Sequence, residues 1–305
     1  MRRAVRRRRT GRLALGLALS FLAASAAAPA RAANRDQPCG WRPSPPRGYD
    51  HVIWVWMENH TYHQVIDQRS APFTTWLSQQ CGSASRYSAV GRPSLPNYLA
   101  ATSGDTHGIH DDDPPTVHRL TANNLFRQLR RSGRSSRTYA ESMPGPCTLK
   151  TTGRYAVKHN PAAYYVGEND RSACGKDNLP LDGSARQLRW DIDHWSLATF
   201  VVVIPNLCDD THDCDVSTGD RWLGSWMARL WTSDLYRDGK TAVFVVWDEP
   251  TPMPNIIMSP STPVGHRVSE PFDHYSLLRS TEEMLGVPLL GRATGAHSMR
   301  GPFRL

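Results

Sequence analysis

Three short apolar runs give the clearest indication of secondary structure in this 305-residue sequence. They are His51–Met57, 199–204 and Thr241–Trp247, which read HVIWVWM, TFVVVI and TAVFVVW. Each run is rich in β-branched or aromatic residues, and its apolar positions are continuous and do not alternate with polar ones. Continuous runs are typical of strands that are covered on both faces, as in a parallel sheet.

Segments with a helix-compatible spacing of apolar residues separate these runs. They are 72–81, 95–102, 121–132, 220–235 and His274–Leu285. An alternation of strands and helices predicts an α/β fold built in layers. The segment 140–195 is rich in Gly, Pro, Asn and Asp, which favours long loops over the sheet. We find no repeats, and we predict a single domain over 49–305 after a Pro-rich linker or strap at 33–48.

The N-terminus has the three parts of a secretory signal peptide, which we predict over residues 1–32. A basic region at 2–12 precedes an apolar run at 13–28, and Ala30-Arg31-Ala32 fits a small-x-small cleavage site. An uncleaved N-terminal anchor is the alternative. The apolar run is short and rich in Ala for a membrane span, so we expect a secreted protein with no stable membrane insertion after signal cleavage.

Setting this segment aside changes the interpretation of the charge. The formal net charge is +8, but residues 1–32 contain eight Arg and no Asp or Glu, so the remainder carries no net formal charge. Outside this segment we find no run of Lys and Arg typical of a site for a nucleic-acid backbone. We therefore expect no nucleic-acid partner, and the sequence does not indicate an oligomeric state.

Six cysteines remain for the exported chain, and an even number favours disulfides. Six cysteines allow 15 pairings. Our hypothesis is Cys208–Cys214, Cys147–Cys174 and Cys39–Cys81. The alternative is a zinc site of Cys208, His212 and Cys214, which an oxidising compartment disfavours because the site needs free thiolates.

Acidic and amide residues follow each of the three apolar runs. The residues are Glu58 and Asn59, then Asn206 with the acidic stretch 209–213, then Asp248 and Glu249. Ligands of open α/β sheets bind outside the carboxyl ends of the strands, so these side chains should meet at one rim. Such oxygens suit a hard divalent cation, which would neutralise a phosphate. The alternative is that Glu58 or Asp248 caps a helix.

Ser94 lies between Pro93 and Pro96 at the start of a predicted apolar helix. By itself this position favours an N-cap, since Ser is preferred there and Pro is tolerated in the first turn. The same geometry also suits a nucleophile, because a helix N-terminus has positive potential and free N–H groups where a phosphate would dock. A G-x-S-x-G motif is absent, which argues against an ordinary esterase.

Four histidines lie near the predicted loops at the rim. They are His107, His159, His212 and His274. Histidines in such places serve as phosphate donors, as leaving-group acids or as metal ligands, although a lone His is more often a surface or capping residue. Composition does not assign these roles.

Taken in order, several short strings resemble the bacterial phosphoesterase family, which holds secreted acid phosphatases and phospholipases C. The strings are Glu58-Asn59, Pro93-Ser94-x-Pro96-Asn97-Tyr98, Lys158-His159-Asn160-Pro161, Ile204-Pro205-Asn206, His212-Asp213, Gly219-Asp220-x-Trp222-Leu223, Trp247-Asp248-Glu249 and His274-Tyr275-Ser276-Leu277-Leu278. They run from about residue 50 to residue 290. Several strings in a fixed order are far more specific than any one of them.

The resemblance implies an alkaline-phosphatase-like fold, a three-layer α/β/α sandwich with a mostly parallel central sheet. It implies a divalent metal ion of unknown identity, and it assigns the metal shell to Glu58, Asn59, Ser94, Asp248 and Glu249. It makes Ser94 the nucleophile that forms a phosphoseryl intermediate, with His107, His159 and His212 as further catalytic residues. Phosphate contacts fall to Asn206, Asp210, Asp213 and His274.

The expected function is a secreted, metal-dependent phosphomonoesterase similar to acid phosphatases. A phospholipase C that acts on phospholipid head groups is the alternative, disfavoured because the C-terminal extensions of many phospholipases C have no counterpart here. The partner is then a small phosphate ester or a phospholipid. An exported binding protein that retains the fold is a third hypothesis. The segment after Glu249 reads Pro-Thr-Pro-Met-Pro, unlike many relatives, and leaves the substrate open.

Overall fold

The computed structural model describes Met1 and residues 37–305, so the predicted signal peptide lies outside the described residues except for Met1. Residues 37–305 contain one nine-stranded mixed sheet. The strands are β1 (His51–Met57), β2 (Gly82–Ser88), β3 (Ser136–Glu141), β4 (Asn178–Leu181), β5 (Phe200–Ile204), β6 (Thr241–Trp247), β7 (Met253–Met258), β8 (His266–Val268) and β9 (Phe272–Asp273).

The strand order is β4-β3-β5-β1-β6-β7-β2-β8, and β9 pairs with β2. β7 is antiparallel to both of its neighbours, whereas all other pairs are parallel. The expectation of a mostly parallel sheet is therefore confirmed. β1 lies between β5 and β6, and its last residue, Met57, is level with Trp247 at the end of β6. These three strands are buried along almost their whole length, as their continuous apolar sequences predict.

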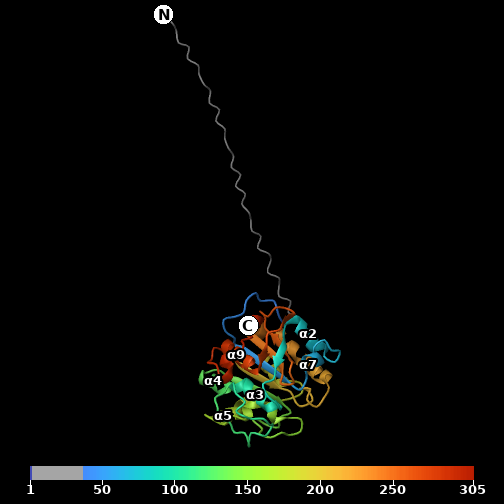
Figure 1. Cartoon of the computed structure of the whole chain (residues 1–305), viewed down its shortest axis with the longest axis vertical. Helices are drawn as coiled ribbons and strands as arrows, with labels where there is room; N and C mark the ends of the chain where they lie inside the picture. Colours follow the sequence, from blue (N-terminus) through green and yellow to red (C-terminus); the bar gives the residue numbers. More distant parts are fainter. Residues whose placement is uncertain (2–36) are drawn as a thin grey trace. The chain divides into compact units, whose positions relative to one another are not determined.

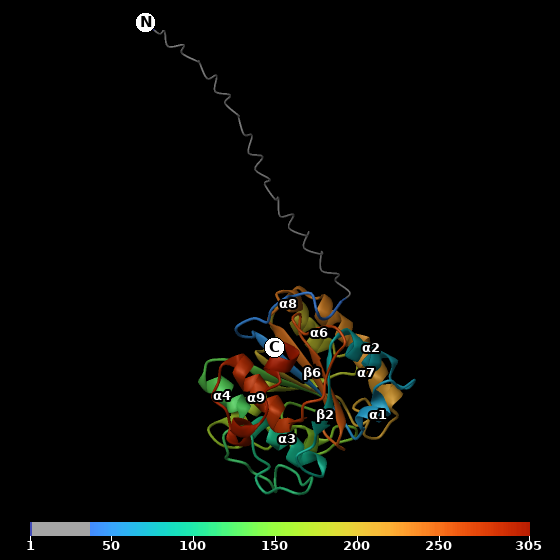
Figure 2. The same cartoon turned by 45° about the horizontal axis from the view of Figure 1, so that its top comes forward.

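Helices cover both faces of the sheet. The α-helices are α1 (Tyr62–Val65), α2 (Pro72–Gln80), α3 (Ser94–Ser103), α4 (Leu125–Arg131), α5 (Asp170–Asp177), α6 (Arg186–Asp193), α7 (Val216–Thr232), α8 (Asp234–Arg237), α9 (His274–Leu285) and α10 (Arg300–Phe303), and short 3-10 helices lie at Val157–His159, Pro161–Ala163 and Gly291–Gly295. α3, α4 and α9 pack together on one face (Figure 1). α2, α6, α7 and α8 form the layer on the other face (Figure 2). The result is the three-layer sandwich.

Two predicted helices differ from the structure because of their caps. α4 begins at Leu125 and not at 121, since the Asn124 side chain accepts a hydrogen bond from the Arg127 amide. The helix predicted over 220–235 begins earlier and is split, since Ser233 ends α7 and caps α8 through the Tyr236 amide. The prediction of long loops over 140–195 was wrong in part, because this segment also supplies α5, β4 and α6.

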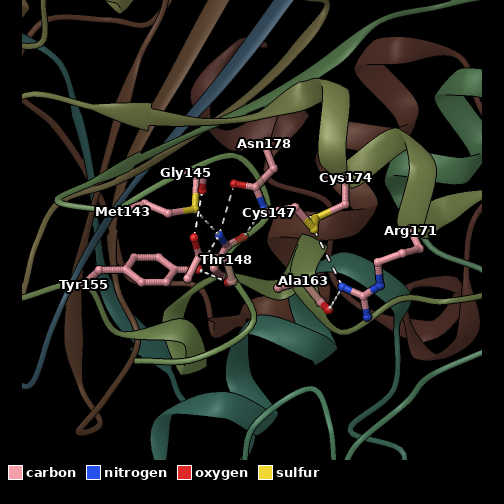
Figure 3. Close-up of a disulfide and its surroundings, with 10 residues drawn as sticks. Met143, Gly145, Cys147, Thr148, Tyr155, Ala163, Arg171, Cys174 and Asn178 are labelled. Carbon is pink, nitrogen blue, oxygen red and sulfur yellow. Dashed lines mark hydrogen bonds between the residues drawn. A yellow bond between two sulfur atoms is a disulfide. The ribbon is translucent and has the colours of Figure 1, made fainter. Parts of the chain in front are cut away.

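All six cysteines form disulfides in the predicted pairing, Cys39–Cys81, Cys147–Cys174 and Cys208–Cys214. The alternative zinc site was therefore wrong, since Cys208 and Cys214 are bonded to each other. Figure 3 shows Cys147–Cys174, which fastens the loop after β3 to α5. Beside it the Cys147 amide donates to the Asn178 carbonyl at 3.1 Å. In residues 37–305, none of the helices has the length and apolar character that a membrane span requires.

Candidate active site

The carboxyl ends of the central strands bring acidic side chains together at one edge of the sheet. Glu58 directly follows β1 and Asp248 directly follows β6. The Asp248 amide donates to the Met57 carbonyl at 3.1 Å, and the Glu58 amide donates to the Asp210 carbonyl at 2.8 Å. These backbone bonds continue the pairing of the sheet past its last residues. Glu58, Asp210 and Asp248 consequently lie at one rim, as the pattern of strand ends predicts.

Glu58 is fully buried and is the centre of this cluster. Its Oε2 accepts a hydrogen bond from Ser94 Oγ at 3.2 Å, and its Oε1 accepts one from the Tyr98 hydroxyl. Both donors lie on α3, one helical turn apart, so they share a face of the helix. α3 begins at Ser94, and the cap position is Pro93, with no side-chain capping bond. Ser94 is therefore not an N-cap, and its hydroxyl lies in the site.

His159 lies between two carboxylates and is only 1% exposed. Its Nε2 lies 3.2 Å from Glu58 Oε1, and its Nδ1 lies 3.3 Å from Asp210 Oδ2. The ring is stacked on Tyr98, with 5.4 Å between centroids. Burial holds the pKa of His159 well below its usual value, and the nearby Lys158 adds to this effect. Because both ring nitrogens face carboxylates, the geometry favours a positioning role over direct contact with substrate.

The clustered carboxylates repel one another in a buried place. Burial and the charges of Asp248 and Asp210 raise the pKa of Glu58 well above its usual value. Burial and the charge of Glu249 raise the pKa of Asp248 to about 7. Burial raises the pKa of Asp210 to about 8. Asp248 Oδ2 is buried and has no hydrogen-bond partner among the described residues. Buried, repelling carboxylates with an unpartnered oxygen fit a divalent cation.

Two other predicted metal ligands adjoin this cluster. The Asn59 amide donates to Asp248 Oδ1 at 3.2 Å, so the backbone of Asn59 directs the Asp248 carboxylate. Glu249 Oε2 lies 3.4 Å from Arg92 Nε at the more exposed side of the site. Glu58, His159 and His212 also have ligand atoms within 4.8 Å of one another. Among the described residues, these three side chains therefore form an alternative metal site next to the predicted one, with nitrogen as well as oxygen ligands.

His212 lies at the mouth of the site on the loop that Cys208–Cys214 closes. Its Nδ1 lies 2.6 Å from Asp213 Oδ1, and its amide donates to Asp210 Oδ1 at 2.7 Å. Its Nε2 lies 3.4 Å from Lys158 Nζ. Asp213 is exposed. Since it pairs with the outer nitrogen of His212, its placement favours orienting that ring over contacting a phosphate.

Three predicted residues do not present a free group to the cluster. His107 lies beyond the far end of α3, where its Nε2 bonds to Ser103 Oγ at 2.8 Å. His274 is fully buried, with Nε2 on the Asp248 carbonyl at 2.9 Å and Nδ1 on the Tyr87 hydroxyl at 3.2 Å. Asn206 Oδ1 accepts the Cys208 amide at 2.9 Å and shapes the loop. In this structure these polar groups bond within the protein, and their predicted roles stay predictions.

Sequence reasoning missed Tyr98, Thr211 and Asp112. Tyr98 could have been found, because it lies four residues after Ser94 and so on the same face of the helix. Thr211 Oγ1 donates to the Glu58 carbonyl at 2.8 Å, and Asp112 Oδ1 accepts the Leu95 amide at 2.9 Å. These two contacts depend on how loops fold back across the rim, and no local pattern indicates them.

Comparisons with known proteins give matches over most of this chain. The model of the phosphoesterase family matches residues 50–252. A phosphatidylinositol-3-phosphatase of Mycobacterium tuberculosis is 28% identical over 258 residues, which cover 81% of this chain and 81% of that protein. An acid phosphatase of Aspergillus fumigatus is 25% identical over 80% of this chain, and a probable acid phosphatase of Kluyveromyces lactis is 26% identical over 79%. The matched regions span 56% and 59% of those fungal proteins.

Solved structures show the same fold at low sequence identity. A protein of the alkaline phosphatase superfamily from Vibrio parahaemolyticus superposes with a TM-score of 0.55 and 11% identity, over 86% of this chain and 73% of that one. The lipoteichoic acid synthase LtaP from Listeria monocytogenes superposes with a TM-score of 0.56 and 11% identity, over 83% and 74%. The alkaline-phosphatase-like fold is thereby confirmed.

Proposed function

This chain belongs to the phosphoesterase family, and from that premise we propose that it is a secreted, metal-dependent phosphomonoesterase with Ser94 as its nucleophile. The observation that carries the proposal is the bond from Ser94 Oγ to the buried carboxylate of Glu58, 3.2 Å away, at the start of α3. The relatives named acid phosphatase and phosphatidylinositol-3-phosphatase support phosphate monoesters as the substrates.

Ser94 is suited to attack a phosphorus atom in line. Its hydroxyl hydrogen is directed at Glu58 Oε2, so the lone pairs of Oγ are left for the attack. The bond from Oγ to phosphorus forms while the bond from phosphorus to the leaving oxygen breaks, and the hydroxyl proton of Ser94 passes to Glu58 Oε2, which gives a phosphoseryl intermediate. Water then attacks the same phosphorus and releases inorganic phosphate, and Glu58 returns the proton to Ser94.

His212 is suited to protonate the leaving oxygen. Asp213 lies against its Nδ1 at 2.6 Å, which leaves Nε2 on the side that faces the site. A carboxylate on one nitrogen fixes the orientation of the ring. The alcohol would leave with the proton of Nε2, and the same nitrogen would then accept a proton from the attacking water.

We assign the metal shell to Glu58, Asn59, Ser94, Asp248 and Glu249. When bound, the cation would lower the pKa of the Ser94 hydroxyl and neutralise phosphate charge. The raised pKa of Asp248, about 7, has its main cause in burial and in the charge of Glu249, and a cation would remove that repulsion. His159 would hold Glu58 in place from its other side.

Secretion is part of the proposal. The basic and apolar pattern of residues 1–32 supports a signal peptide. Three disulfides with no free cysteine among the described residues fit an oxidising compartment. The test is to fuse residues 1–32 to a reporter and to sequence the N-terminus of the exported chain. A reporter that stays inside the cell would refute this part alone.

The activity is tested by phosphate release from p-nitrophenyl phosphate at pH 4–9 with divalent metals, with and without chelator. We expect turnover that the chelator abolishes, and a loss of at least about 10³-fold in Ser94→Ala. Ser88→Ala, at the partly buried end of β2, is the matched control and should retain wild-type activity. Release of phosphocholine from phosphatidylcholine in place of inorganic phosphate would favour a phospholipase C. Absence of any release would overturn the proposal.

A further inference from the structure

The loop that follows α3 folds back and brings Asp112 to the beginning of the same helix. Asp112 Oδ1 accepts a hydrogen bond from the Leu95 amide at 2.9 Å. Asp112 Oδ2 accepts one from Lys158 Nζ, also at 2.9 Å. One carboxylate thus bridges the amide next to Ser94 and an ammonium group of the rim.

The two donors that Asp112 joins are suited to an anion. The Leu95 amide is in the first turn of α3, a helix of ten residues, where amides have no acceptor within the helix. Lys158 has a side chain that is 21% exposed and lies 3.4 Å from His212 Nε2. Amides at a helix N-terminus together with a Lys are the common protein ligands of phosphate.

A separate observation indicates a cation beside these donors, which would also attract an anion. Asp248 is fully buried, and its Oδ2 has no hydrogen-bond partner among the described residues. Leu95 directly follows Ser94 in the sequence, and Lys158 Nζ lies 3.4 Å from His212 Nε2 at the mouth of the site. The donors around Asp112 are therefore contiguous with the cluster that holds Ser94, and an anion bound to them would lie beside the nucleophile.

A carboxylate and a phosphate present the same chemistry to these donors, since both offer acceptor oxygens that carry negative charge. We propose that the Leu95 amide and Lys158 form the subsite for the non-bridging oxygens of a phosphate monoester, and that Asp112 occupies this subsite until the substrate displaces it. This inference rests on the proposed function and names the substrate class of that site. A monoester dianion gains more from Lys158 than a diester monoanion does.

Two roles of Asp112 predict different effects of its removal on phosphate binding. If Asp112 competes with the substrate, its removal makes phosphate bind more tightly, because phosphate no longer has to displace a side chain from the subsite. If Asp112 only holds Lys158 in place, its removal makes phosphate bind more weakly. The two roles therefore predict opposite signs for the same substitution.

The test uses the exported chain with divalent metal and inorganic phosphate as the probe, with binding measured by calorimetry at pH 7. We expect Asp112→Asn to lower the Kd of inorganic phosphate by about tenfold. Asp113→Asn is the matched control, since it removes the same charge from the exposed neighbouring residue, and it should leave the Kd within about twofold. Lys158→Met should raise the Kd by about tenfold or more, and Lys158→Arg should restore most of the affinity.

Turnover gives the second readout. The ratio of kcat/KM for p-nitrophenyl phosphate to that for bis(p-nitrophenyl) phosphate should fall about tenfold in Lys158→Met and rise in Asp112→Asn. Thermal unfolding of each variant shows whether it has folded. A higher Kd in Asp112→Asn, or a Kd unchanged in Lys158→Met, overturns the inference. Wild-type protein that binds phosphate but turns over neither ester would refute the proposed function and not this subsite.

Discussion

Tyr98 holds the carboxylate of Glu58 in place from a buried position on α3. Its hydroxyl donates to Glu58 Oε1. Its ring lies against Trp56, with 4.4 Å between centroids, and is stacked on His159. Tyr98→Phe would keep these ring contacts and lose only the hydrogen bond to the carboxylate. Outer partners of metal ligands typically contribute 10–100-fold in metal affinity or activity, so we expect this variant to need about tenfold more divalent metal for half-maximal activity.

The measurement is a metal titration of phosphate release after chelation. Tyr165→Phe is a suitable control, because its hydroxyl shares a hydrogen bond with Thr102 Oγ1 at 2.7 Å on the same helix, away from the carboxylates. That variant should keep the wild-type metal requirement. A Tyr98→Phe curve that overlays the wild-type curve would show that Glu58 does not depend on this bond.

Gly104 determines how the end of α3 meets the segment after α9. Its φ is +76°, and a Cβ at this position would lie 2.3 Å from the Leu290 carbonyl oxygen. Gly108 has a similar φ of +69°, but a Cβ there would meet no atom within 4 Å. Gly108→Ala should therefore lower the free energy of unfolding by about 1–2 kcal/mol, the cost of a left-handed conformation. Gly104→Ala should lower it further, since backbone must shift. Urea unfolding of both variants measures this difference, and equal losses would contradict it.

Glu282 makes the stability of the α9 region depend on pH. Its Oε1 accepts the Leu290 amide at 3.0 Å, and burial raises its pKa to about 9. A carboxyl with a raised pKa keeps its proton in the folded protein while the unfolded chain loses it, so it stabilises below its unfolded pKa of about 4.3, and this contribution is lost as the pH rises to about 9. Glu282→Gln should therefore gain stability relative to the wild type from pH 5 to pH 9.

Thermal melts of both proteins across this range give the difference. Glu270→Gln is the control, because Glu270 is exposed, and its melting temperature should follow that of the wild type. A constant difference between Glu282→Gln and the wild type across the range would mean that Glu282 is ionised in the folded protein.

The sequence predicts the centre of this molecule better than its edges. β1, β5 and β6 are buried on both faces, so their apolar residues are continuous and mark the strands, and Glu58 and Asp248 could be placed because they follow strand ends. β2 reads GSASRYS and β4 reads NLPL. Their strand character comes from hydrogen bonds to neighbouring strands and not from their own residues. The position of Asp112 beside Ser94 could not be predicted either. Asp112 lies in the loop after α3, and its contact with the Leu95 amide forms only because that loop folds back to the beginning of the helix.

Two of the three disulfides have different effects: one mainly stabilises the whole chain, and the other mainly positions residues of the site. Cys39 and Cys81 are 42 residues apart, whereas Cys208 and Cys214 are 6 apart and enclose Asp210 and His212. By the entropy of the closed loops, the longer link contributes about 4 kcal/mol and the shorter about 2 kcal/mol. Within the short loop Thr211 has a φ of +78°, a conformation that a β-branched residue adopts only under constraint.

Replacing both cysteines of a pair by serine should therefore affect the two disulfides differently: the long link matters more for stability, and the short link matters more for activity. The double variant of Cys39 and Cys81 should lose more stability but keep kcat/KM within about twofold in the folded protein. The variant of Cys208 and Cys214 should lose less stability but about tenfold or more in kcat/KM, because small displacements of catalytic groups are costly. Thermal melts and phosphate release, measured on the same preparations, separate the two effects. If kcat/KM falls in proportion to stability in both variants, the short loop does not position Asp210 and His212.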